Sequence, residues 1–111
     1  MLTIETLAKE IGLKILVEGD LNRQIKTGYC GDLLSWVMSK AQQDDAWFTV
    51  MGNVNSIAVA VLTDVSCIIL TEDAVLDSDA KNKAEMQEVT VLSSDKSAYA
   101  LSVTLSKLLD E

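Results

Sequence analysis

The chain has 111 residues and a formal net charge of −8 at neutral pH; 49% of its residues are hydrophobic and 5% are aromatic. This length predicts one domain, residues 1–111, with enough buried surface to fold without a disulfide or metal staple. The negative charge argues against nucleic-acid and anionic-membrane binding. No apolar run approaches the roughly 20 residues of a membrane helix.

The cysteine content indicates the cellular compartment, and the aliphatic content indicates the oligomeric state. Cys30 and Cys67 are far apart and form no CxxC motif, and the first residues do not resemble a signal peptide. We therefore expect a cytoplasmic protein with reduced thiols. Because exposed apolar surface seldom persists on a monomer, the aliphatic surplus predicts a homodimer or larger homo-oligomer.

The first half of the chain predicts a helix, a strand and a second helix. Thr3 can cap a helix over Ile4–Ile11 that ends at Gly12. An apolar run over Ile15–Val17 indicates a strand. The segment Gly31–Gln42 has the apolar spacing of a helix packed on a sheet.

From residue 45 onward strands and helices alternate. Residues 47–50, 66–70 and 89–92 are expected as strands, and residues 54–63, 78–87 and 95–109 as helices, the last capped at Ser94. Ile57–Leu62 is apolar on all sides and fits a buried strand or helix; a helix connects its neighbours better. The alternation predicts a three-layer α/β/α domain with a mostly parallel sheet.

The stretch Leu21–Met38 contains the only arginine and two of the five glycines. We expect Thr27, Gly28 and Gly31 in a strand-to-helix turn, where backbone amides approach an anion, with Arg23 just upstream. Asp32 is expected in the first helical turn. There it favours the helix dipole without any ligand, so a purely conformational role for the glycines stays open.

A second candidate is the turn at residues 51–56, where Asn53 and Asn55 can bind a nucleobase, a ribose or a partner's backbone, or simply cap the helix. The chain has no P-loop and no G-x-G-x-x-G pattern, so ATP-dependent chemistry has no support from the sequence. With no histidine and two cysteines, we expect no metal and no cofactor. The weakest hypothesis is a small enzyme that uses Cys30 or a pair of carboxylates for catalysis.

Several stretches resemble the DRTGG domain family. Its letters occur here in spaced order as Asp20, Arg23, Thr27, Gly28 and Gly31. "GDLLSWVMSKA" resembles the family's helix start. "WFTVMGNVNSIAVAVLTDVSCIILTED" resembles its strand, asparagine turn, helix and next strand.

The resemblance implies a domain similar to the N-terminal domain of HPr kinase/phosphorylase, without the kinase P-loop, and a regulatory or ligand-sensing role. The expected function is therefore non-catalytic. The chain would bind an adenine nucleotide or small anionic metabolite near Arg23, Thr27, Gly28, Gly31, Asp32, Asn53 and Asn55, and act through a separate effector protein. The alternative is a ligand-free interaction or scaffold subunit.

Overall fold

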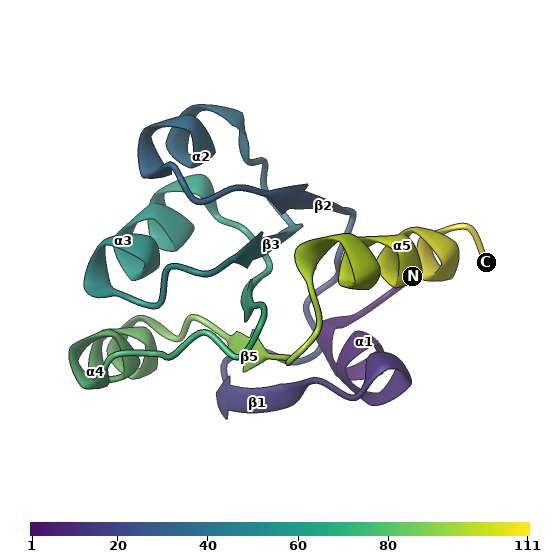
Figure 1. Ribbon diagram of the computed structural model, residues 1–111, viewed down its shortest axis with the longest axis horizontal. Coiled ribbons are helices and arrows are strands. Elements are labelled where there is room, and N and C mark those ends of the chain that lie inside the picture. The colour runs from purple at the N-terminus through teal and green to yellow at the C-terminus, as the bar shows by residue number, and fades with distance from the viewer.

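The computed structural model describes residues 1–111, which form five helices and five strands (Figure 1). In chain order these are α1 (Ile4–Ile11), β1 (Lys14–Val17), β2 (Thr27–Cys30), α2 (Leu34–Lys40), β3 (Asp45–Thr49), α3 (Val54–Thr63), β4 (Cys67–Leu70), α4 (Ser78–Gln87), β5 (Val91–Ser93) and α5 (Ala98–Leu109).

The strands form one sheet in the order β1-β5-β4-β3-β2. The pairs β2–β3, β3–β4 and β4–β5 are parallel, whereas β1 joins β5 antiparallel. The carboxyl ends of four strands therefore meet at one end of the sheet, and the start of β1 lies there too, since Lys14 pairs with Ser93. The predicted α/β class with a mostly parallel sheet is confirmed.

Helices cover both faces of the sheet (Figure 1). Side chains alternate along β3, so that Trp47 joins the core beneath α2, α3 and α4, while Ala46 and Phe48 join the core beneath α1 and α5. All three side chains are at most 1% exposed. The predicted three-layer arrangement is confirmed.

Local capping signals account for two helix starts. The Thr3 side chain accepts a hydrogen bond from the Thr6 amide at α1, and Asn53 accepts one from Ser56 at α3. Gly12 ends α1 with φ of 68°. The apolar run at Ile57–Leu62 lies in α3, as the preferred reading expected.

The glycine stretch differs from its prediction. Thr27 and Gly28 lie inside strand β2 rather than in a turn, and β2 pairs with β3 over its whole length. Glycine has a low strand propensity, so the sequence pattern did not predict this strand. Helix α2 begins only at Leu34, so Asp32 precedes the helix instead of lying in its first turn.

The last elements are shifted by a few residues. Ser97, not Ser94, caps α5, because its side chain accepts a hydrogen bond from the Ala100 amide.

None of the five helices has both the length and the apolar composition needed to cross a bilayer.

Candidate functional site

At the carboxyl ends of β2 and β3, Asp32 ties the two strands together. Its Oδ1 accepts hydrogen bonds from Thr49 Oγ1 at 2.7 Å and from the Val50 amide at 2.9 Å. The indole of Trp47 donates to the carbonyl of Gly31 at 2.9 Å. The Thr49 hydroxyl and the Val50 amide already donate to Asp32, and the Trp47 indole already donates to Gly31, so none of these three groups is free to hold an anion.

The two asparagines lie at the same end of the sheet, where α3 begins. Asn53 Oδ1 accepts from the Ser56 amide at 3.1 Å, which leaves the Asn53 side-chain NH₂ without a protein partner. Asn55 is exposed, and its side chain makes no hydrogen bond within the protein. Amide groups with spare donors can bind a base, a ribose or a carbonyl.

Gly52 brings the next loop against this turn. A Cβ at Gly52 would lie 2.1 Å from the carbonyl oxygen of Val75. The Asp77 amide also donates to the carbonyl of Gly52 at 2.8 Å. The asparagine turn and the loop between β4 and α4 are thus in direct contact and form one continuous edge.

A hollow of about 320 Å³ lies on the far side of that loop. Its polar lining comes from Lys14 of β1, Asp73, Lys81 of α4 and Ser93 of β5, and its apolar lining includes Leu76. Neither lysine forms an ion pair, although the protein is strongly acidic. Two ammonium groups that form no ion pair lie here with one carboxylate, Asp73, and apolar side chains, and such a lining can bind an anion attached to an apolar body.

The sequence analysis singled out none of Lys14, Lys81 and Ser93. Lys14 reaches this hollow because β1 pairs antiparallel with β5, a strand almost 80 residues later. No short-range pattern reports such pairing. The alternation of later elements could have indicated that the start of α4 lies near the end of β5.

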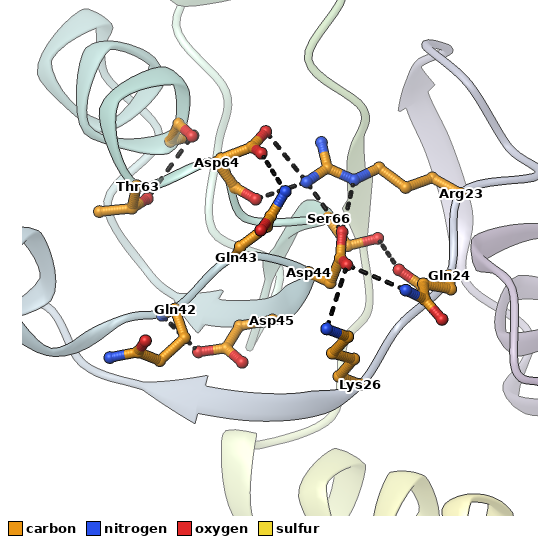
Figure 2. A network of polar contacts seen from close by, with 11 residues as sticks. Arg23, Gln24, Lys26, Gln42, Gln43, Asp44, Asp45, Thr63, Asp64 and Ser66 are labelled. Atoms are coloured by element: carbon orange, nitrogen blue, oxygen red, sulfur yellow. Dashed lines mark hydrogen bonds and ion pairs between the residues drawn. The ribbon is translucent and has the colours of Figure 1, made fainter.

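Arg23 lies at the opposite end of the sheet, at the amino ends of β2, β3 and β4 (Figure 2). Its Nε donates to Asp44 Oδ1 at 3.0 Å, and its Nη2 lies 3.0 Å from Asp64 Oδ1. Nη2 also donates to the carbonyl of Asp64. The guanidinium therefore connects the segment that precedes β2 to the loops that precede β3 and β4.

Asp44 is a buried member of this network. Its other oxygen accepts from Gln24 Nε2 at 3.1 Å, and Lys26 Nζ lies 4.0 Å away. Burial raises the pKa of the Asp44 carboxyl, but the hydrogen bonds from Arg23 and Gln24 and the charges of Arg23 and Lys26 outweigh it and lower that pKa below its usual value. Asp44 is also held at φ of 68°. The network holds together the segments at the amino ends of β2, β3 and β4.

The structure thus separates the residues expected to form one site. Gly31, Asp32, Asn53 and Asn55 lie at the carboxyl ends of the strands, while Arg23 is paired at the amino ends. Strand β2, with Thr27 and Gly28, stands between them and spans roughly 13 Å at about 3.3 Å per residue. The expected single site is divided because the glycine stretch forms strand β2 instead of a turn.

The cysteines offer little for catalysis. Burial raises the pKa of Cys67 to about 12, against a smaller lowering by the Arg23 charge. Cys30 is exposed, and its Sγ lies 3.2 Å from the Ser102 hydroxyl, which is not a base. No three side chains of the metal-binding types gather closely enough to hold a metal ion.

A family model described as the DRTGG domain matches residues 6–108. The chain belongs to the DRTGG domain family. The match covers both ends of the sheet described above, including the spaced letters from Asp20 to Gly31. No curated protein matches the sequence.

This DRTGG chain is also similar to a solved structure that is described as the crystal structure of the CBS and DRTGG domains of the regulatory region of Clostridium perfringens pyrophosphatase complexed with activator, diadenosine tetraphosphate. The TM-score is 0.72 at 9% sequence identity. The similarity covers 93% of this chain and 45% of that chain, so our chain spans less than half of it. At this identity the likeness shows a shared fold.

Proposed function

We propose that this DRTGG chain is a non-catalytic regulatory module that binds an adenine nucleotide or a small anionic metabolite and acts through a separate effector protein. Membership of the family supports a regulatory role. The similar solved structure is a regulatory region in complex with a nucleotide activator, which supports the ligand class. We further propose that residues 1–111 work as one domain in the cytoplasm, with a fold similar to that of the HPr kinase N-terminal domain, and that the chain forms a homodimer.

The proposed ligand site is the carboxyl end of the sheet. The observation that carries it is the meeting of Lys14 and Lys81, both without an ion pair, at one hollow in a protein of net charge −8. These lysines would bind the anionic part of the ligand, and Leu76 its apolar part. Asn53 and Asn55, across the loop, would contact a base or ribose.

The proposal changes the role of the other residues expected at the site. Asp32 and Gly31 would shape the far wall of this edge, and Thr27 and Gly28 would support it through β2. Arg23 would contribute through stability alone, because Asp44 and Asp64 already occupy its guanidinium.

Calorimetric titration with ATP, AMP, diadenosine tetraphosphate and acetyl phosphate tests the proposal. We expect at least one to bind, and a double variant Lys14→Gln/Lys81→Gln to bind it at least fivefold more weakly, because two charge-assisted contacts are lost. Lys83→Gln, on the same helix but outside the hollow, is the matched control. No heat and no thermal shift with any of the four, or a double variant that binds like the wild type, would overturn the site.

A scaffold role is the second candidate, and exposed apolar side chains favour it. Trp36 on α2 is 61% exposed and Leu62 on α3 is 70% exposed. If these residues bind a partner, Trp36→Ser and Leu62→Ser should abolish co-purification of that partner without changing the unfolding temperature. A single-chain solution mass with no co-purifying protein counts against this candidate.

A further inference from the structure

Helix α3 is apolar on the face that it turns away from the sheet. Its inward side is buried, through Ser56, Ile57, Val59 and Ala60. The outward stripe consists of Val54, Ala58, Val61 and Leu62, at the spacing of one helical face. Val61 is 45% exposed and Leu62 is 70% exposed. A helix that is apolar on all sides normally lies buried, so this stripe is a surface that calls for a covering partner.

The lack of charge is a property of α3 and not of every helix on this side of the sheet. Charged residues make up 23% of the chain, yet none occurs at residues 46–63. Helix α4 has the same length and packs beside α3, but it exposes charged side chains, namely Asp79, Lys81, Lys83 and Glu85. On the other side of α3, α2 contains a single charge, Lys40.

The missing charge favours a second copy of this chain as the occupant. Two copies that each carry −8 repel one another, so they can meet closely only where neither contributes a cluster of carboxylates. A basic partner would instead be attracted by acidic side chains, which the outward stripe of α3 does not have. The centre of a protein interface is typically depleted of charge in the same way.

We propose that α3 packs antiparallel against α3 of a second copy, about a twofold axis at Ala58. The stripe is symmetric around this residue, because Val54 lies four positions before it and Leu62 four positions after it. In such a twofold contact Val54 of each copy meets Leu62 of the other. Residues four apart form the ridge that gives the commonest helix crossing, at about −50°.

The side chain of Ala58 suits the position on the axis. Ala58 is half-buried and lies at the middle of the outward stripe, where it meets Ala58 of the second copy. Two methyl groups in contact allow the helix axes to approach to the short end of the usual range of about 8–10 Å. Val54 and Leu62 then enclose the alanine pair from both ends.

The neighbouring helices are compatible with this arrangement. Figure 1 shows α2, α3 and α4 side by side on one face of the sheet. When two copies of α3 pack antiparallel face to face, α2 lies on the same side as α2 of the second copy, and α4 on the same side as α4. Helix α2 adds apolar surface, since Trp36 is 61% exposed, and it has no acidic residue. The charges of α4 are of both signs, so neither flank brings together two purely acidic surfaces.

The first test is the solution mass, measured by sedimentation over a range of concentrations. We expect the wild type to be a dimer. Ala58→Asp places two carboxylates face to face on the twofold axis, so the dissociation constant of the dimer should rise at least tenfold. Leu62→Ser removes an apolar contact with Val54 twice in each dimer and should also weaken it.

Disulfide formation locates the contact independently. In a Cys30→Ser background, which removes the exposed native thiol, Ala58→Cys should oxidise to a covalent dimer. The proposed axis brings these two residues within the distance of about 4.4–6.8 Å between Cα atoms that a disulfide spans.

Ala100 provides the matched control, because it is also a half-buried helical alanine but lies on α5, at the opposite face of the sheet. Ala100→Asp should remain dimeric, and Ala100→Cys in the same background should not form a covalent dimer. Circular dichroism and the unfolding temperature report whether each variant folds.

Three results would overturn the inference. The first is a wild-type monomer at about 100 µM, where a dimer with a micromolar dissociation constant would be largely assembled, whether or not the monomer binds a different protein through α3. The second is a folded Ala58→Asp that dimerises like the wild type. The third is equal cross-linking of Ala58→Cys and Ala100→Cys.

This inference rests on the homodimer of the proposed function and specifies its interface. A dimer that neither α3 variant weakens would reject the interface and leave the homodimer standing. Ligand titration is a separate measurement, so failure at α3 leaves the proposed ligand site testable.

Discussion

Replacing Arg23 with methionine removes the charge at the centre of the amino-end network while keeping much of the apolar stem. Asp44 then keeps one neutral hydrogen bond from Gln24 and an ammonium group 4.0 Å away on Lys26. Breaking a fully buried ion pair costs about 3–5 kcal/mol, and breaking an exposed one about 0–1 kcal/mol. The Arg23 and Asp44 side chains are 28% and 12% exposed, which places this pair between the two limits.

We therefore expect Arg23→Met to lower the free energy of unfolding by about 2 kcal/mol, or the unfolding temperature by roughly 8 °C. The Asp64 carboxylate contributes little, because its side chain is 55% exposed. Urea unfolding followed by circular dichroism measures the effect. Lys9→Met is the control: it breaks the exposed ion pair with Glu5, at 3.1 Å, and should change stability by less than about 0.5 kcal/mol.

A double-mutant cycle with Asp44→Asn isolates the coupling between the two side chains. We expect Arg23→Met to cost much less when Asp44 is already asparagine. If the two changes are additive, or if Arg23→Met costs no more than Lys9→Met, the argument that this network stabilises the fold is refuted.

Acid and three other changes test further parts of the structure. The pKa of Asp44 is lowered in the folded protein. The stabilisation of the fold by the ionised Asp44 carboxylate should therefore be complete above the unfolded pKa of about 3.9 and disappear as the pH falls below it toward the folded pKa. The free energies of unfolding of the wild type and Asp44→Asn, measured with urea, should accordingly converge as the pH is lowered from 6 to 2. Gly52→Ala should destabilise the protein by about 2 kcal/mol, because the new methyl group meets the Val75 carbonyl, whereas Gly12→Ala, with open space but φ of 68°, should cost about 1 kcal/mol; equal effects would contradict the close approach. A colorimetric thiol reagent should label Cys30 alone in the native protein and Cys67 only after denaturation, since Cys67 is buried with a pKa near 12; labelling of both at neutral pH without denaturant would show that the core is more open than described.

Most of the helices and the fold class follow from the sequence, because their determinants lie within a few residues. Thr3 and Asn53 cap helices through hydrogen bonds to amides three residues later. The alternation of apolar runs and helical spacing after residue 45 was sufficient to predict a parallel sheet with helices on both faces. The resemblance to the DRTGG family, carried by short motifs, is confirmed by the family match.

Tertiary pairing decided the rest. Thr27–Cys30 is a strand only because β3 lies beside it over its whole length, and Lys14 reaches the hollow with Lys81 only because β1 pairs with β5. Arg23 looked free beside a glycine turn, yet it is held by carboxylates about 20 and 40 residues later in the chain. Caps and periodicity act between neighbours and can be read along the chain, whereas strand partners and the reach of long charged side chains depend on residues that only the folded sheet brings together.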